Sequence, residues 1–236
     1  MSSDAEGAAL KSLAELGLTA LRPFSKPLSG LFIDSRLVQE GGLFIALPGT
    51  QSHGAEFAAQ AIEHGAAAVL TDQDGHALMR QSLAEISVAM VVVEDPAAAL
   101  ASAAALWFEA QPQKIVAVTG TNGKTSTCQL ITHLIQENDI PCGSLGTLGF
   151  STPSGIISTS FTTPESVEVQ QMLSFLKSGG INHAVMEISS HALEMHRVDD
   201  VQIDVAVYTQ LSQDHLDYHK NMGNYFQAKL KLFTQL

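Results

Sequence analysis

An apolar run that leads through a glycine-rich loop into a helical pattern constrains this chain most strongly. The run, VAVTGTNGKTST, occupies residues 116–127, and its apolar half favours a buried strand. Gly120 and Gly123 allow a tight turn in which several backbone N–H groups face one anion. The start of the following helix adds partial positive charge. Lys124 can reach the terminal phosphates of a nucleotide, and the Thr125 hydroxyl can bind Mg²⁺, so the pattern predicts a phosphate-binding loop.

The loop is a variant of the general pattern G-x-x-x-x-G-K-[ST]. Counting back from Gly123, the first glycine position holds Val118. The alternative is an ordinary glycine-rich turn between a strand and a helix. The strand, the Gly-Lys-Thr segment and the helix nevertheless occur in the order that phosphate binding needs. We therefore expect seven consecutive residues to hold a nucleotide, and they are Gly120, Thr121, Asn122, Gly123, Lys124, Thr125 and Ser126.

Composition and charge exclude several classes of function. The chain has 236 residues and is 45% hydrophobic, which predicts one or two domains with packed cores. Its 12 basic and 24 acidic residues give a formal charge of −12, which disfavours general binding to nucleic acid or to anionic membranes. There is no CxxC pair, no membrane-length apolar run and no signal-peptide pattern. We expect a cytoplasmic protein, with no membrane insertion, that is monomeric.

Strands alternate with helices along the chain, which predicts an α/β layer architecture. Pro112 follows a long alanine-rich helix, after which the pattern restarts. We expect a small N-terminal domain at residues 1–111 and part of a nucleotide-binding domain at residues 112–236. The predicted strands are 31–36, 41–49, 66–72, 88–95, 114–120, 183–190 and 203–212. The predicted helices are 5–16, 55–65, 74–86, 96–110, 124–137, 163–179 and 225–233, and residues 141–150 read as a glycine-punctuated segment.

The second unit shows few strands for a nucleotide-binding sheet. Its last predicted helix, which Asn221 or Asn224 could cap, belongs in the middle of such a domain rather than at its end. We therefore expect that the chain is a truncated protein or a gene fragment.

At the glycine-rich loop the sequence resembles a known family. TGTNGKTST is similar to the ATP loop of the Mur ligases, the ATP-dependent amide-forming enzymes of peptidoglycan synthesis. IDSRLVQEGGLFIAL resembles the uridine-nucleotide domain at the N-terminus of those ligases that add the third residue or the terminal dipeptide. The segments TTPESVEVQ, MEISSHAL and LSQDHLDYH resemble the ligases that add the third residue to UDP-N-acetylmuramoyl-L-alanyl-D-glutamate. In that family the central domain continues beyond the position of Leu236, and a C-terminal domain follows.

This resemblance implies a reaction and its partners. ATP would phosphorylate a carboxylate of the UDP-linked dipeptide, and the amine of a diamino acid would attack the resulting acyl phosphate. Meso-diaminopimelate is expected as the diamino acid rather than lysine, because it is the commoner case in the family. Mg²⁺ and fixed cations are needed because several phosphates and a carboxylate must approach one another. Without the rest of the family's length, the chain is expected to bind substrate with little turnover.

The resemblance also assigns metal and catalytic roles. Glu187 ends an apolar strand, where a carboxylate can bind Mg²⁺. Lys229 matches a lysine that CO₂ carbamylates in the family, giving a group that helps hold a second Mg²⁺, and His215 matches a residue of that second site. Lys124, Glu187, His215 and carbamylated Lys229 are thus the expected catalytic residues, and Thr125 joins the last three as metal ligands. The residues alone leave open a surface lysine at 229 and zinc binding by His215 and His219.

Substrate contacts follow from the same comparison. The expected residues are Ile33, Ser35, Thr50, Gln51 and Ser52 for the uridine nucleotide, and Thr162, Thr163, Ser189 and Arg197 for the muramoyl-dipeptide and its phosphates. Hydroxyl groups and an arginine fork suit pyrophosphate and carboxylates, although Thr163 before Pro164 also reads as a helix cap. Three positions depart from the family pattern, namely Phe161, Met195 and Gln210.

The sequence alone leaves other functions open. One is a binding module without turnover. Another is a different member of the superfamily: a terminal-dipeptide ligase, or a folylpolyglutamate or cyanophycin synthetase. The two synthetases share the ATP loop but should lack the Asp-Ser-Arg segment at residues 34–36, so binding of a uridine nucleotide separates them from this chain.

Overall fold

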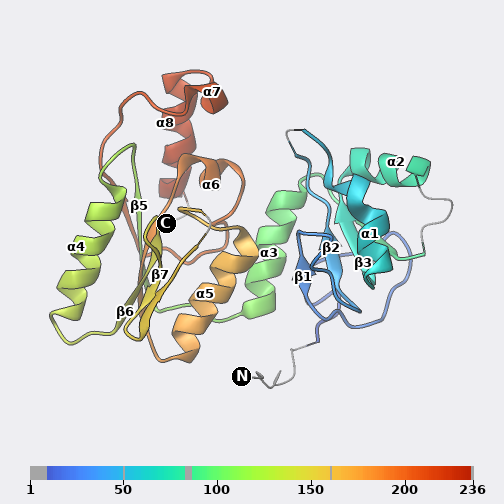
Figure 1. The fold of residues 1–236 in the computed structure, drawn as a ribbon, viewed down its shortest axis with the longest axis horizontal. Helices are drawn as coiled ribbons and strands as arrows, with labels where there is room; N and C mark the ends of the chain where they lie inside the picture. The colour runs from blue at the N-terminus through green and yellow to red at the C-terminus, as the bar shows by residue number, and fades with distance from the viewer. Residues whose placement is uncertain (1–9, 50, 83–86, 160, 235–236) are drawn as a thin grey trace. The chain divides into compact units, whose positions relative to one another are not determined.

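The chain forms two compact units, residues 1–107 and 108–236, in a computed structural model (Figure 1). The structure describes residues 10–49, 51–82, 87–159 and 161–234. The boundary predicted after residue 111 lies a little beyond this division, before the first strand of the second unit. Each unit is an α/β structure with a mainly parallel sheet, and this confirms the predicted fold class. None of the helices in these ranges has the length and apolar character that crossing a bilayer requires.

The first unit is built on a four-stranded parallel sheet in the order β1-β2-β3-β4. Its strands are β1 (Leu31–Phe32), β2 (Leu43–Ile45), β3 (Ala68–Thr71) and β4 (Ala89–Val92). The helical segments between and after them are η1 (Gly54–Phe57), α1 (Ala58–Glu63), α2 (Gln73–Ser82) and α3 (Pro96–Phe108). Asp95 caps α3 as the Asp-Pro pair predicts, because its Oδ1 accepts the N–H groups of Ala97 and Ala98 at 3.0 Å.

The helix predicted at residues 5–16 is wrong over its described part. Lys11 instead forms an isolated antiparallel bridge with Leu28, and residues 13–17 are a turn. Leu13 and Leu16 are both buried, so the apolar spacing that suggested a helix comes from side chains that the turn places in the core. Residues 5–9 lie outside the described ranges.

The second unit contains a six-stranded sheet in the order β10-β5-β9-β6-β7-β8. Its strands are β5 (Lys114–Thr119), β6 (Cys142–Gly146), β7 (Gly149–Thr152), β8 (Gly155–Ile157), β9 (His183–Glu187) and β10 (Val205–Tyr208). The helices are α4 (Lys124–Gln136), α5 (Ser166–Ser178), α6 (Ser190–Glu194), α7 (Leu216–His219), α8 (Met222–Leu230) and η2 (Lys231–Thr234). Asn221 caps α8 by accepting the N–H of Asn224 at 2.8 Å.

Strand β6 and the start of β7 lie in residues 141–150, which the sequence marked only as glycine-punctuated, and β8 follows that segment. Gly143, Gly146 and Gly149 hide the strand pattern, because each stands where a side chain would have too little room. A Cβ on Gly143 would lie 2.5 Å from the Leu176 side chain of α5, and one on Gly146 would lie 2.2 Å from Glu187 Oε1. The sheet therefore has more strands than the sequence indicated.

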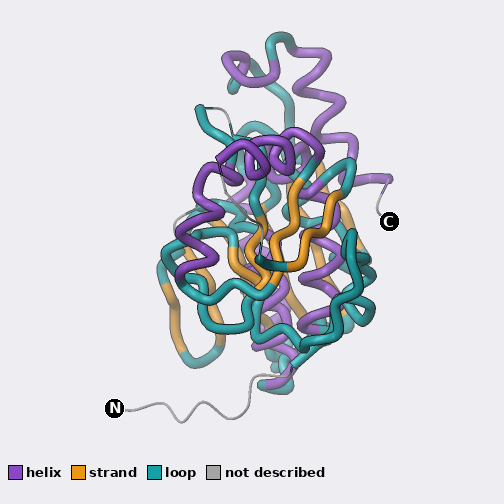
Figure 2. Tube along the Cα trace, turned by 90° about the vertical axis from the view of Figure 1, so that its right-hand side faces the viewer, coloured by secondary structure: helices purple, strands orange, loops and turns teal. Residues whose placement is uncertain are grey.

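The topology brings the chemically important segments of the second unit to one edge of its sheet. Strands β10, β5 and β9 are mutually parallel, so their carboxyl ends meet at the same edge. The glycine-rich loop follows β5, Glu187 ends β9, and Thr209 follows β10. Helices α7 and α8 lie together at one end of this unit (Figures 1 and 2).

Candidate nucleotide and metal site

The two loop glycines adopt backbone conformations that other residues avoid. Gly120 has φ +138°, and Gly123, the residue that precedes α4, has φ +84°. A Cβ on Gly120 would lie 2.0 Å from Thr209 Oγ1, so the strand end after β10 also requires glycine there. The sequence thus folds into a tight loop with α4 starting directly behind it, as an anion-binding turn needs.

Gly120→Ala is expected to destabilise the protein far more than Gly155→Ala. Gly155 has nearly the same φ, +144°, but nothing lies within 4 Å of the position its Cβ would take. The control therefore measures the backbone cost alone, about 1–3 kcal/mol, whereas Gly120→Ala adds an overpacking cost of about 1–3 kcal/mol. Urea unfolding of the two variants measures the difference, and equal losses would show that the Thr209 contact is not tight.

The segment that follows β10, residues 209–212, holds the loop in place through Thr121 and Asn122. Thr121 N–H donates to the Gln210 carbonyl at 2.8 Å, and Thr209 Oγ1 donates to the Asn122 carbonyl at 2.7 Å. Thr121 Oγ1 and the Ser212 backbone exchange two hydrogen bonds of 3.0 and 3.1 Å. Gln210, one of the departures from the family pattern, contributes its backbone carbonyl to Thr121, and that bond does not depend on the side chain.

Two lysines converge on one loop carbonyl. Lys124 Nζ donates to the carbonyls of Gly120 and Thr121 at 3.0 and 2.9 Å, and Lys229 Nζ donates to the Gly120 carbonyl at 2.9 Å. Burial lowers the pKa of Lys124, against the opposing charges of Glu187 and Asp214. Burial first, and then the charge of Lys124, lower the pKa of Lys229 to about 8. Two cationic groups beside the loop suit a ligand that carries several negative charges.

Glu187 is a buried carboxylate, 2% exposed, surrounded by hydroxyl and amide donors. Its Oε2 accepts from Thr125 Oγ1 at 2.8 Å and from Thr147 Oγ1 at 3.2 Å, and its Oε1 accepts Thr147 N–H at 2.9 Å. The Thr125 hydroxyl and the Glu187 carboxylate are thus adjacent, and both are oxygen ligands of the kind Mg²⁺ prefers. The residues present fit a magnesium ion that takes its remaining ligands from phosphates and water.

His215 and His219 do not form a zinc site in this structure. His219 is buried and its Nε2 lies 2.9 Å from Ser190 Oγ, whereas His215 is half exposed and its Nε2 lies 3.5 Å from Asp214 Oδ2. No group of three or more His, Cys, Asp and Glu side chains suited to a metal occurs in the described ranges. The rings of His215 and Tyr225 lie 6.2 Å apart, which places His215 beside the helix that carries Lys229.

The residues expected to bind the muramoyl-dipeptide surround the end of β9. Thr162 Oγ1 lies 3.1 Å from Thr147 Oγ1, and Thr163 Oγ1 donates to the Glu187 carbonyl at 2.8 Å. Thr163 is therefore not the helix cap that its sequence position suggested, since α5 begins at Ser166 after Glu165. Ser189 caps α6 by accepting the N–H of Ala192 at 3.1 Å.

Arg197 is held among both polar and apolar groups. Its Nη1 donates to the Thr163 carbonyl at 3.1 Å, and its guanidinium pairs with Glu165. Phe161 and Met195, the two other departures from the family pattern, both contact it: the Phe161 ring centroid lies 5.4 Å from Cζ, and Met195 Sδ lies 3.5 Å from Nη2. The buried Nε has no hydrogen-bond partner among the described residues. Phe161 and Met195 thus both contact the guanidinium group of Arg197.

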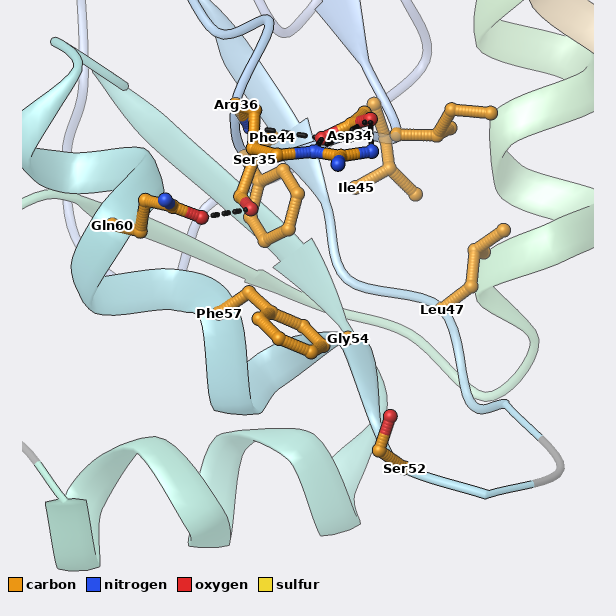
Figure 3. Close-up of a pocket in the computed structure, with 11 residues that line it drawn as sticks. Asp34, Ser35, Arg36, Phe44, Ile45, Leu47, Ser52, Gly54, Phe57 and Gln60 are labelled. Carbon is orange, nitrogen blue, oxygen red and sulfur yellow. Dashed lines mark hydrogen bonds and ion pairs between the residues drawn. The ribbon is translucent and has the colours of Figure 1, made fainter.

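The first unit contains a separate pocket of about 560 Å³ at the carboxyl ends of β1 and β2 (Figure 3). The rings of Phe44 and Phe57 supply flat apolar walls, and Ser35 Oγ donates to Gln60 Oε1 at 2.7 Å on one side. Arg36 forms a two-pronged ion pair with Asp34, with bonds of 2.9 and 2.6 Å, which lowers the pKa of Asp34 to about 2. Aromatic walls with fixed polar groups suit a planar, polar ring.

The structure places three of the five expected uridine contacts on this pocket. Ile33, Ser35 and Ser52 line it, and Gln51 is exposed in the loop before Ser52. Thr50 lies outside the described residues.

Several residues at these sites were missed from the sequence. Thr147 binds Glu187 through both its backbone and its hydroxyl, Thr209 packs against Gly120, and Tyr225 donates to Thr121 Oγ1 at 3.2 Å. Gln60 and Phe57 line the first pocket. The only available signal was position: Thr147 follows a glycine and Thr209 follows a strand that runs parallel to β5.

Comparison with known proteins identifies the family. The description "Mur ligase middle domain" matches residues 118–236, and "Mur ligase family, catalytic domain" matches residues 27–108. The chain belongs to the Mur ligase family. This confirms the resemblance seen in its motifs.

Relatives within the family are named UDP-N-acetylmuramoyl-L-alanyl-D-glutamate--2,6-diaminopimelate ligases. The protein of Geobacter sulfurreducens is 42% identical over 90% of this chain and 41% of its own length. That of Brucella melitensis is 40% identical over 89% of this chain and 42% of its own length. The chain thus spans about two fifths of the length of these relatives.

Solved structures show the same fold. A structure titled UDP-N-acetylmuramoyl-L-alanyl-D-glutamate--2,6-diaminopimelate ligase superposes with a TM-score of 0.78 at 30% identity, covering 94% of this chain and 44% of that one. MurF from Acinetobacter baumannii gives a TM-score of 0.61 at 20% identity, over 98% of this chain and 47% of that one. The second match supports the shared architecture alone.

Proposed function

We propose that this chain is part of an ATP-dependent ligase that adds the third amino acid to UDP-N-acetylmuramoyl-L-alanyl-D-glutamate during peptidoglycan synthesis. The observation that carries the proposal is the phosphate loop facing a buried carboxylate, with Lys124 on the loop and Thr125 bound to Glu187 at 2.8 Å. Relatives at 40–42% identity whose names state this reaction support the substrate class. Those names also favour meso-diaminopimelate as the amino acid.

The proposed reaction proceeds in two steps. The terminal phosphoryl group of ATP passes to a carboxylate oxygen of the UDP-linked dipeptide, giving an acyl phosphate and ADP. The amine of the amino acid then attacks the acyl carbon, the tetrahedral intermediate expels phosphate, and an amide forms with loss of the amine proton. Positioning and charge neutralisation supply most of the catalysis in phosphoryl transfer. The proposed role of Lys124 is to neutralise the terminal phosphates.

Magnesium would be held by Thr125 and Glu187, with a second ion near His215 and Lys229. Bound Mg²⁺ would screen the charge of the phosphates as the carboxylate approaches. Lys229 is a candidate for carbamylation because CO₂ reacts with a neutral amine, and a pKa of about 8 leaves part of this buried amine neutral near pH 7. Thr162, Thr163, Ser189 and Arg197 are proposed to hold the muramoyl-dipeptide.

The reaction is tested by phosphate release. The protein in its full encoded length is supplied with ATP, Mg²⁺, UDP-N-acetylmuramoyl-L-alanyl-D-glutamate and either meso-diaminopimelate or lysine. We expect phosphate release that requires all the components, and faster turnover with meso-diaminopimelate. Absence of turnover with both amino acids would contradict the proposal. The 236-residue chain alone, which spans about two fifths of its relatives' length, is expected to bind substrate but to ligate little.

The pocket of the first unit is proposed to bind the uridine part of the substrate. Ser35→Ala is expected to weaken UDP binding about three- to tenfold, since one hydrogen bond contributes roughly 0.5–1.5 kcal/mol. Calorimetric titration of UDP into the chain measures the change. Ser29→Ala is the matched control: this serine donates to the Glu40 carbonyl at 2.7 Å and does not line the pocket.

The same titration separates the proposed function from two of the superfamily alternatives, the folylpolyglutamate and cyanophycin synthetases. A folylpolyglutamate or cyanophycin synthetase has no use for a uridine nucleotide, so saturable UDP binding favours the peptidoglycan role. No UDP binding to the wild-type chain would favour one of those synthetases. The cytoplasmic location and the monomeric state stay predictions.

A further inference from the structure

Tyr225 of α8 contacts the phosphate loop, although the reaction proposed above gives it no role. Its side chain is 1% exposed, and its hydroxyl donates to Thr121 Oγ1 at 3.2 Å. Buried tyrosine hydroxyls usually have a hydrogen-bond partner, and here the partner lies in the loop, 104 residues earlier in the chain. The contact therefore joins two segments that are far apart in sequence at the site itself.

The Thr121 hydroxyl uses its whole hydrogen-bonding capacity in this contact. It donates to the Ser212 carbonyl at 3.1 Å and accepts from Ser212 N–H at 3.0 Å and from Tyr225 Oη. A hydroxyl has one donor and two acceptor positions, so the network is complete. A complete network favours one side-chain arrangement over others, and removal of the tyrosine hydroxyl leaves one acceptor position empty.

The ring of Tyr225 supports a second contact between α8 and the loop. Lys229 Nζ lies 4.5 Å from the ring centroid and donates to the Gly120 carbonyl at 2.9 Å. Residues 225 and 229 are one helical turn apart and therefore share a face of the helix. Helix α8 thus binds two successive loop residues, Gly120 through Lys229 and Thr121 through the tyrosine hydroxyl.

We propose that Tyr225 is a positioning residue, which holds Gly120 and Thr121 in the conformation that receives the nucleotide. It acts through Thr121 and Lys229 and touches no reacting atom. The inference rests on the proposed function, in which this loop binds ATP. A loop that is ordered before its ligand arrives loses less conformational entropy on binding, so loss of the Tyr225 hydroxyl weakens nucleotide binding without removing any contact to the nucleotide.

The chain offers a closely matched control in Tyr208. This tyrosine of β10 is in the same unit, and its buried Oη has no hydrogen-bond partner among the described residues. Tyr208→Phe and Tyr225→Phe remove the same atom, but only the second removes a hydrogen bond to the loop. Each variant keeps its ring, so core packing and the ring contact with Lys229 are preserved.

The experiment compares Mg·ADP binding in the protein of full encoded length. Calorimetry is expected to show about three- to tenfold weaker binding for Tyr225→Phe and unchanged binding for Tyr208→Phe. Thr121→Val removes the acceptor, so adding Tyr225→Phe to it should weaken binding no further. A purely structural role would lower the melting temperature but would not produce this non-additivity. Wild-type affinity in Tyr225→Phe, when the wild type binds Mg·ADP, would overturn the inference.

Hydrogen exchange gives a second measurement that does not depend on nucleotide binding. The amides of residues 120–122 are expected to exchange about three- to tenfold faster in Tyr225→Phe than in the wild type or in Tyr208→Phe. If the wild type binds no Mg·ADP, the proposed function fails. Exchange then decides the inference alone, and equal rates in all three proteins would overturn it.

Discussion

Lys124→Ala is expected to lower kcat/KM for ATP roughly 10²–10³-fold, the loss typical when one preorganised charge-stabilising group is removed. Lys124 Nζ donates hydrogen bonds to the loop carbonyls of Gly120 and Thr121, at 3.0 and 2.9 Å. A triphosphate that enters the loop offers this ammonium group stronger, charged acceptors than two carbonyls. Steady-state kinetics with the full encoded protein measure the loss, and nucleotide titration shows how much of it is binding.

The fold is expected to survive this substitution. Burial lowers the pKa of Lys124, which means that the folded protein accommodates the charged amine poorly and loses little stability without it. Lys114→Ala is the control: Lys114 begins the same strand, β5, at the end away from the loop, and pairs with Asp204 at 2.7 Å on the surface. Its kcat/KM should stay within about twofold, because exposed ion pairs contribute little. Unchanged kinetics in Lys124→Ala would contradict the proposed function.

Glu187→Gln is expected to lower kcat on the order of 100-fold or more, since metal-assisted charge stabilisation contributes several kcal/mol. The amide keeps the shape of the carboxylate and can keep its contacts, because the Thr147 N–H still finds an oxygen and the hydroxyls of Thr125 and Thr147 can rotate to accept. What it loses is the negative charge that would attract Mg²⁺. The Mg²⁺ concentration for half-maximal activity should therefore rise as kcat falls, while the melting temperature changes little.

Glu194→Gln serves as the control for this charge change. Glu194 ends α6 in the same unit and pairs with Lys231 at 2.8 Å on the surface, so its loss should leave the Mg²⁺ dependence unchanged. If Glu187→Gln shows wild-type kcat and wild-type Mg²⁺ dependence, the carboxylate does not hold the metal.

The phosphate loop could be predicted from sequence because its requirements are local. A strand, two glycines with positive φ and a Gly-Lys-Thr segment at a helix start all occur within residues 116–127, and each leaves a direct mark on the residue types. Asp95 before Pro96 is a similar case, since one side chain caps the helix that follows it. The alternation of strands and helices predicted the α/β class for the same reason.

The surroundings of Glu187 could not be predicted because they depend on contacts between distant segments. Thr147 binds this carboxylate across 40 residues of sequence, and Gly146 leaves room for it. Thr163 read as a helix cap because threonine before proline commonly caps, yet the carbonyl of Glu187 takes its hydroxyl instead. The helix predicted over residues 10–16 was wrong for a different reason: buried leucines in a turn have the same spacing as the apolar face of a helix.

Binding of Mg·ATP depends on both the phosphate loop and the Glu187 carboxylate. Calorimetric titration of ATP into the protein of full encoded length, in the presence of Mg²⁺ and again in excess EDTA, measures the loop and its metal together. We expect one saturable ATP site per chain. Removal of Mg²⁺ should weaken ATP binding to the wild type, whereas ATP binding to Glu187→Gln should be the same with and without Mg²⁺. Absence of saturable ATP binding in the presence of Mg²⁺ would contradict this expectation.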